Sequence, residues 1–240
     1  MSASSESPSQ LDHELNALRG HLLDMAQLVD EQFADAVNAL VQSDAELGEQ
    51  VAARDHEIDA MELAIDRHCE RILALHTPVA ADLRMLIMAV KTNTDLERIG
   101  DHCRNLARYV RPLAEWPDLI EQATIPQMAD LARDMLRQAE QSFLEKDRVH
   151  ARQVIARDHQ VNRLHAQNLT DLIAQLSTHP DRAEALSYLI TTSKAIERIS
   201  DHAKNIAQGV VFLVEGTDIR HQRLSSSERS VSESPNNDET

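Results

Sequence analysis

The chain has 240 residues, a formal net charge of −16 and only 2% aromatic residues. A surface this acidic repels phosphate backbones and anionic lipids, which disfavours nucleic-acid binding and electrostatic attachment to a membrane. Glycine and proline are scarce, with 5 and 7 residues, which is typical of long helices packed through aliphatic side chains. We therefore expect an all-α protein. The sequence offers neither an apolar leader segment nor an apolar run near twenty residues, so we expect it in the cytoplasm, without membrane insertion.

Apolar residues at near-heptad spacing predict three long helices in the first half of the chain. These helices are expected over residues 11–43, 47–75 and 81–110. Pro78 ends the second helix, because a proline disfavours helical backbone in the residue before it. Pro112 and Pro117 are expected to close the third. Three long helices with short links predict an antiparallel bundle.

The second half of the chain repeats the first. Arg54, Asp55 and His56, for example, recur 103 residues later, and this offset falls to 100 in the last helix. A fourth helix is therefore expected from about 126 to 146, a fifth from there to about 176, and a sixth from about 182 to 214. The sequence thus predicts two tandem antiparallel three-helix bundles, with six long helices in all. We place the bundles at 11–113 and 114–219, and we expect the polar segments 1–10 and 220–240 to be disordered.

One phrase occurs in both halves with its charged residues intact. It reads TNTDLERIGDHCRNLA at 92–107 and TSKAIERISDHAKNIA at 192–207. At about 100° per residue, Glu97 and Asp101 share a helix face turned away from the apolar seam, and Glu197 and Asp201 do the same. Two acids one helical turn apart repel unless something offsets their charge.

Two explanations for these acidic faces are open on the residues alone. Arg98, Arg104, Arg198 and Lys204 could form ordinary salt bridges with them on a solvated surface. Alternatively, the carboxylates could bind divalent or transition metal ions such as Fe, Zn, Mn or Mg. Acids on the preceding helices strengthen this second interpretation. The candidate metal ligands are Glu97, Asp101, Glu197, Asp201, Asp55, Asp59 and Asp158, with His102 and His202 as further imidazole candidates.

Motifs for catalysis are missing from the sequence. There is no glycine-rich phosphate loop, no Cys-x-x-Cys and no His-Glu-x-x-His, so we do not expect an enzyme. Cys69 and Cys103 lie in helical patterns and are expected to be buried thiols in a reducing compartment. The alternatives are a carboxylate-bridged metal-dependent hydrolase or oxidase and a purely structural helical module. Against the hydrolase or oxidase, such sites usually lie inside a bundle, whereas these acids point outward.

Several motifs resemble the PhoU family of phosphate-signalling regulators. They are PVAADLR at 78–84, LERIGDHCRNLA at 96–107, and ERISDHAKNIA at 197–207 followed by GTDIRH at 216–221. The resemblance runs from about residue 11 to 221. It implies two similar three-helix bundles that dimerise and bind metal through Glu/Asp-x-x-x-Asp motifs. In this chain those motifs are Glu97 with Asp101 and Glu197 with Asp201, accompanied by Asp55, Asp59 and Asp158.

The resemblance also implies a function. Members of this family act as negative regulators of phosphate uptake and phosphate-starvation signalling, without catalysis of their own. They link the ATPase subunit of a phosphate ABC transporter to a membrane sensor histidine kinase, which would recruit this cytoplasmic chain, as a homodimer, to the inner face of the membrane. The two copies of the phrase differ, because Ser200 replaces Gly100 and Asn162 stands at the position of Asp59. We therefore expect a weaker or differently built metal site in the second half.

Overall fold

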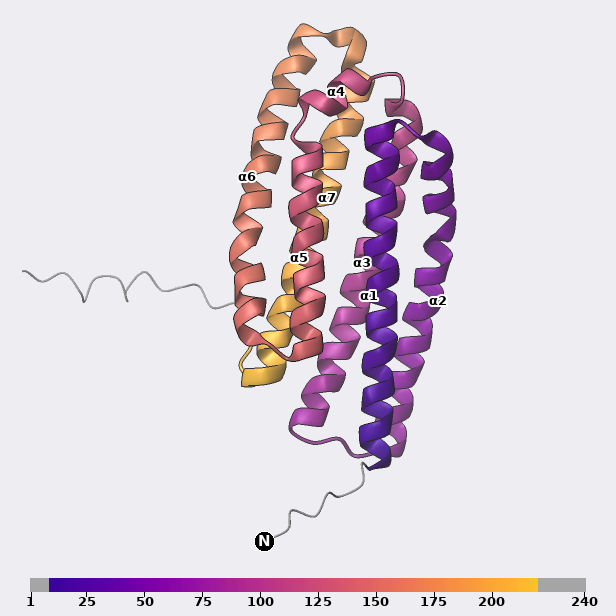
Figure 1. Cartoon of the computed structure of the whole chain (residues 1–240), viewed down its shortest axis with the longest axis vertical. Coiled ribbons are helices and arrows are strands. Elements are labelled where there is room, and N and C mark those ends of the chain that lie inside the picture. The colour runs from indigo at the N-terminus through magenta and orange to yellow at the C-terminus, as the bar shows by residue number, and fades with distance from the viewer. Residues whose placement is uncertain (1–8, 220–240) are drawn as a thin grey trace, which may run out of the picture.

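A computed structural model describes residues 9–219, and its first half is a bundle of three long helices (Figure 1). These are α1 (Gln10–Gln42), α2 (Ala45–Leu75) and α3 (Ala81–Leu113). Ser9 caps α1 by accepting a hydrogen bond from the Asp12 N–H, and the Asp12 carboxylate accepts one from the Ser9 N–H in return. Asp44 caps α2 in a similar way, accepting from the Leu47 N–H at 3.0 Å. Both caps satisfy N–H groups that a helix start leaves unpaired.

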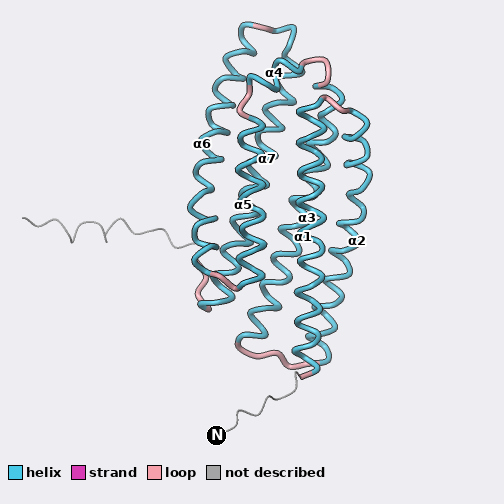
Figure 2. Tube along the Cα trace, in the orientation of Figure 1, coloured by secondary structure: helices cyan, strands magenta, loops and turns pink. Residues whose placement is uncertain are grey.

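The second half repeats this plan with additional short segments. It contains α4 (Pro117–Gln122), α5 (Ile125–Glu145), α6 (Arg148–Thr178), the 3₁₀ turn η1 (Pro180–Arg182) and α7 (Ala183–Glu215). Figure 2 shows helices joined by short loops, and the described residues contain no strand. The predicted all-α fold, with two three-helix bundles in tandem, is therefore confirmed.

The structure corrects the prediction for the end of the third helix. Pro112 lies inside α3, and Pro117 begins the short helix α4 instead of closing the third helix. A proline in the last turn of a helix removes one late hydrogen bond, and the buried Val110 and Leu113 keep this turn packed. A proline at the first helical position removes none. Of the segments predicted to be disordered, residues 1–8 and 220–240 lie outside the described residues. Ser9 caps α1, and Gln10 is its first residue.

The two bundles pack against each other through α3 and α7, and through α1 and α5. The outer helices α2 and α6 lie at opposite sides of the molecule (Figure 1). Each copy of the repeated phrase buries its apolar seam completely or nearly so, with residues Leu96, Ile99, Cys103 and Leu106 on α3 and Ile196, Ile199, Ala203 and Ile206 on α7. Across residues 9–219, every helix is too short or too polar to cross a bilayer.

Charged side chains join α1 to α5. Asp30 accepts hydrogen bonds from the Arg133 guanidinium at 2.8 and 3.0 Å and from Arg137 Nη2 at 3.0 Å. Asp30 and Arg133 are 103 residues apart, so they occupy equivalent positions in the two halves. Glu140 lies near this group, and its Oε1 is buried without a hydrogen-bond partner among the described residues. Burial, and to a smaller extent the Asp30 carboxylate, raise the pKa of Glu140 to about 7.

Candidate functional site

The first copy of the repeated phrase places a concentration of carboxylates between α2 and α3. Burial raises the pKa of Glu97, and the negative charges of Asp101, Glu62 and Asp59 raise it further. The pKa of Glu62 is raised as well, first by burial and then by Asp66 and Asp59. Arg98 opposes the shift of Glu97, with its Nε at 3.6 Å from the Glu97 carboxylate. Burial is the larger cause of both pKa shifts, and the neighbouring carboxylates add to it because their negative charges disfavour a further ionised group.

Arg104 connects this acidic surface to a buried acid. Asp55 on α2 is only 4% exposed, and its carboxylate accepts a hydrogen bond from Arg104 Nη1. The other terminal nitrogen of Arg104 lies 2.6 Å from Asp101 Oδ1. One guanidinium therefore compensates two of the predicted metal ligands, Asp55 and Asp101. This part of the site agrees with the salt-bridge explanation.

Glycine at position 100 allows the close approach of α2 behind these acids. A Cβ at Gly100 would lie 2.9 Å from Cδ1 of Ile58, which is closer than packed carbon atoms come. In the second half, Ser200 is fully buried at the equivalent position and donates its hydroxyl to the Glu197 carbonyl at 2.8 Å. The two helix pairs therefore pack differently beneath their acidic faces.

The second copy of the phrase carries more positive charge. Lys194 Nζ lies 2.6 Å from the Glu197 carboxylate, whereas the equivalent residue in the first half is Thr94. Lys204 donates hydrogen bonds to Asp158 at 2.8 Å and to Asp201 at 2.7 Å. Burial lowers the pKa of Lys204, but the two carboxylates raise it by more, so the pKa lies above its ordinary value. Three of the predicted ligands are thus neutralised by lysines.

Neutral side chains replace two further acids in the second half. Asn162 stands at the position of Asp59, and His165 at the position of Glu62. His165 Nδ1 lies 2.9 Å from the Ser193 hydroxyl, and burial lowers the pKa of this imidazole. The Oδ1 atoms of Asp158 and Asn162 are buried and have no hydrogen-bond partner within the described part of the chain. These two neighbouring oxygens could therefore accept a cation.

The carboxylates of the first half suit a hard divalent ion best, because their mutual repulsion is what such an ion would offset. The side chains as they lie do not yet converge on one point. In residues 9–219, the three acidic or imidazole groups whose ligand atoms come within 4.8 Å of one another are Glu145, Asp147 and His150. Bringing Asp55 and Asp101 onto one ion requires the Arg104 side chain to move away.

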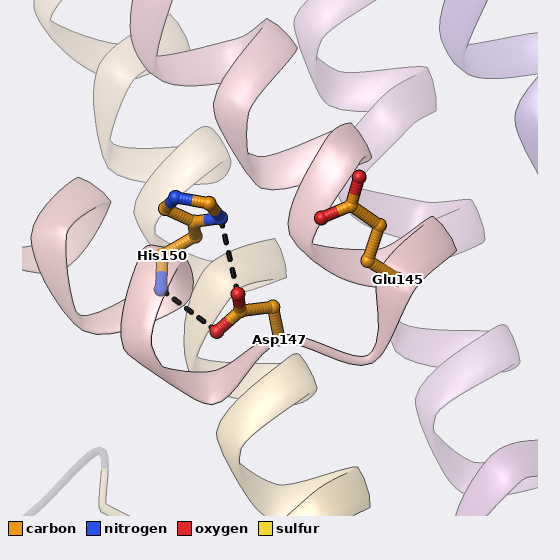
Figure 3. A group of neighbouring side chains, drawn as sticks. All are labelled: Glu145, Asp147 and His150. Atoms are coloured by element: carbon orange, nitrogen blue, oxygen red, sulfur yellow. Dashed lines mark hydrogen bonds and ion pairs between the residues drawn. The ribbon is translucent and has the colours of Figure 1, made fainter.

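The group of Glu145, Asp147 and His150 has a structural explanation of its own (Figure 3). Asp147 caps α6, and its Oδ1 accepts hydrogen bonds from the backbone N–H groups of Val149 and His150 at 2.7 and 3.1 Å. Its Oδ2 lies 3.2 Å from His150 Nδ1. The two backbone hydrogen bonds lower the pKa of Asp147, as is usual for a helix-capping carboxylate. Helix capping therefore accounts for Asp147 and His150, while Glu145 accepts a hydrogen bond from Gln141 on its own helix.

The histidines of the repeated phrase lie at the contact between the two bundles. The rings of His102 and His202 have centroids 5.8 Å apart. His202 Nδ1 lies 2.8 Å from Asp95 Oδ1, which also accepts a hydrogen bond from Asn205 at 3.2 Å. Burial, and then the nearby His202, lower the pKa of His102 to about 4. Both imidazoles therefore contribute to the α3–α7 contact in this structure.

Comparison with known proteins identifies the family. The model of the PhoU domain matches the chain twice, at residues 22–110 and 125–210. The chain belongs to the PhoU family. A relative from Pseudomonas putida, named as a homolog of the phosphate-specific transport system accessory protein PhoU, is 38% identical over 90% of this chain and 84% of its own. A relative of the same name from Pseudomonas aeruginosa is 38% identical over 88% of both chains.

Solved PhoU structures share this fold. The crystal structure of PhoU from Pseudomonas aeruginosa superposes with a TM-score of 0.81 at 36% identity, covering 87% of this chain and 100% of that one. The phosphate transport system regulatory protein PhoU from Streptococcus pneumoniae gives a TM-score of 0.80 at 29% identity, with coverage of 87% and 99%. The family is one of transport accessory proteins and contains no known enzyme, which agrees with the prediction for this chain.

Two residues of the candidate site could not be found by the spacing used on the sequence. Glu62 belongs to the first acidic surface, and Lys194 neutralises the second. Glu62 follows Asp59 by three residues, a spacing that places both on one helix face. Lys194 precedes Glu197 by the same spacing. A search for charged pairs three residues apart, in addition to pairs four residues apart, would therefore have found both.

Proposed function

We propose that this PhoU-family chain is a negative regulator of phosphate uptake and phosphate-starvation signalling. The observation that carries the proposal is the extent of its similarity to proteins named as accessory to phosphate-specific transport, which covers about nine-tenths of the chain. As an adaptor, it would link the ATPase subunit of a phosphate ABC transporter to a membrane sensor histidine kinase. It would work as a homodimer in the cytoplasm, at the inner face of the membrane.

A deletion strain tests this regulatory role. Alkaline phosphatase activity is measured in high phosphate, with and without a plasmid that carries the chain. Constitutive activity that the plasmid restores to the repressed level is the expected result, and normal repression in the deletion strain contradicts the proposal. Co-purification with the transporter ATPase and the kinase tests the adaptor arrangement, and light scattering of the purified chain tests the dimer.

We further propose that the acidic faces bind divalent or transition metal ions, such as Fe, Zn, Mn or Mg. The first site would use Glu97, Asp101, Asp55 and Asp59, and the raised pKa of Glu97 supports it. The second site would use Glu197, Asp201 and Asp158. It should bind more weakly, because Lys194 and Lys204 already neutralise these groups.

Metal content tests this second proposal. The chain is purified, loaded with Mn²⁺ or Fe²⁺ and passed over a desalting column before the ions are counted. Asp101→Ala should lose more metal than Asp201→Ala. The first site is expected to bind metal more tightly, because lysines already neutralise the carboxylates of the second site. Equal metal content in both variants and in the unchanged chain would remove metal binding from the proposed function and leave the regulatory role standing.

A further inference from the structure

A row of apolar side chains lies exposed at the beginning of α3. Leu83, Ile87 and Val90 are 40%, 37% and 43% exposed, and Val79, just before the helix, is 64% exposed. Spacings of four and three residues place the helical members on one face. We call Val79, Leu83, Ile87 and Val90 the apolar stripe. Isolated exposed hydrophobic residues are common in proteins, but a continuous row marks a surface suited to contact with another molecule.

The same face of α3 continues into the acidic surface. At about 100° per residue, Leu83, Ile87, Val90, Thr94, Glu97 and Asp101 all lie within an arc of about 80°. Asp59 and Glu62 of α2 act on Glu97 from the adjoining helix. One side of the first bundle therefore presents an apolar half followed along the helix axis by a negatively charged half.

A hollow of about 320 Å³ lies beside the stripe, between α3 and α7. Its wall includes Met88, Val90 and Thr94 from α3 and Gly209 and Phe212 from α7. Binding energy at protein interfaces concentrates where a large side chain fills such a pocket. This hollow is suited to receive one anchoring side chain from a molecule lying along the stripe.

The second bundle lacks this combination. The residues equivalent to Leu83 and Ile87 are Ala183 and Ser187, and Ile190 alone keeps the apolar character of the row. Lys194 replaces Thr94, while Asn162 and His165 replace Asp59 and Glu62. The apolar row and the excess negative charge are therefore lost together, so the surface is specific to the first half.

We propose that this face of α3 docks an amphipathic helix of a partner protein. The apolar side of that helix would cover the stripe, and a cluster of Lys or Arg at one end would lie over Asp59, Glu62, Glu97 and Asp101. The charge of the surface selects this partner. The carboxylates beside the stripe, in a chain of net charge −16, oppose nucleic acid and anionic lipid, whereas they attract a basic segment. This inference rests on the proposed adaptor function, which requires partner proteins.

Designed peptides test the inference on the full chain. The probe is a fluorescein-labelled helix of about 18 residues, or five turns, with leucines along one side and three arginines on the same side at one end. A second peptide carries the arginines at the other end, and a third replaces them with glutamates. Binding is followed by fluorescence anisotropy in EDTA, so that no metal ion occupies the carboxylates.

One arginine peptide should bind, and its affinity should fall as salt increases from about 0.05 to 0.5 M, because salt screens the charge pairs. The double variant Leu83→Ala/Ile87→Ser carries the residues that the second bundle has, so it should fold normally. It should weaken binding by roughly tenfold or more, since its leucine and isoleucine contacts are gone. Ile173→Ser, at a site on α6 that is 51% exposed, is the matched control and should change nothing.

A charge variant separates the two parts of the surface. The triple variant Asp59→Asn/Glu62→His/Thr94→Lys introduces the residues of the second bundle. It should bind the arginine peptide more weakly than the unchanged chain does, and it should bind the glutamate peptide at least as tightly. Three results overturn the proposal: equal binding of the arginine and glutamate peptides, unchanged binding by the stripe variant, or conversion of a dimer to a monomer in that variant. The last would assign the stripe to a second copy. The deletion-strain assay does not depend on these peptides, so the regulatory role can stand if docking fails.

Discussion

In the first bundle, Glu97 lies among Asp59, Glu62 and Asp101, and the nearest cation to it is Arg98 at 3.6 Å. In the second bundle, the ammonium group of Lys194 lies 2.6 Å from Glu197. The backbones of the two halves follow the same plan, so a few side chains create this difference. A repeated fold can therefore keep its packing in both copies while one copy retains unneutralised charge and the other removes it.

The largest expected effect comes from breaking the buried ion pair of the first half. Asp55→Ala leaves Arg104 with one of its two carboxylates, and we expect a loss of about 3 kcal/mol in the free energy of unfolding. Asp158→Ala is the matched change in the second half. It should cost less. The variant loses the hydrogen bonds that Asp158 Oδ2 accepts from Lys204 and Asn162, but it also removes the buried Oδ1, which has no hydrogen-bond partner among residues 9–219 and is costly to keep out of water. Urea denaturation followed by circular dichroism measures both, and a larger loss for Asp158→Ala would reverse the comparison.

A pH-dependent effect is expected at Glu140, whose equivalent in the first half is Val37. Burial raises the pKa of Glu140 from its ordinary value of 4.5 to about 7, so the folded chain holds this proton more tightly than the unfolded chain does. Stability is therefore lost as the pH rises from 4.5 through 7. Glu140→Gln should remove that loss and stabilise the chain by about 2 kcal/mol above pH 7.

Denaturation at several pH values checks this prediction. The gain from Glu140→Gln should disappear below pH 4.5, where the carboxyl group is protonated in both states. Glu145→Gln, at an exposed position on the same helix, serves as the control. A gain that is the same at all pH values would mean that packing of the amide, and not loss of the buried charge, stabilises the variant.

Exchanging one residue between the halves should change metal affinity. Thr94→Lys gives Glu97 the cation that Glu197 already has, and it should weaken Mn²⁺ binding by roughly tenfold through competition for the carboxylate. Lys194→Thr should strengthen binding at the second face. Isothermal titration calorimetry measures both affinities, and the comparison fails if the two exchanges shift them in the same direction.

The smallest effect is expected from the packing difference beneath the acidic faces. Gly100→Ser would place a Cβ 2.9 Å from the buried Ile58 Cδ1, and we expect a loss of about 1 kcal/mol as Ile58 moves. Ser200→Gly, the reverse change, removes a hydroxyl that bonds to its own helix and opens a small void. Thermal denaturation compares the two variants, and an increase in stability for Gly100→Ser would contradict the tight approach of α2 and α3.

The long helices could be predicted from the sequence because a repeating apolar seam and helix-ending residues define each of them. The ends of α2 and α6 came within a few residues of the prediction for this reason. The short helix α4 could not be found in the same way, since six residues are too few to show a period. Pro117 is interpreted from the sequence as the end of a helix, although proline is also common in the first turn of a helix.

The sequence could supply candidate residues for the site but not their contacts. Helical geometry placed Glu97 and Asp101 outside the core, where the structure has them half-buried. Periodicity does not say which carboxylate a long, flexible side chain will choose, so the double role of Arg104 between Asp55 and Asp101 required the structure. The same holds for Lys204, which reaches from α7 to Asp158 on α6.

The ion pair between Asp30 and Arg133 joins equivalent positions of the two halves. An identical charged residue at both positions could not form it, because an acid would face an acid or a base would face a base. The two halves are therefore not interchangeable at this contact, and α1 is matched in charge to α5.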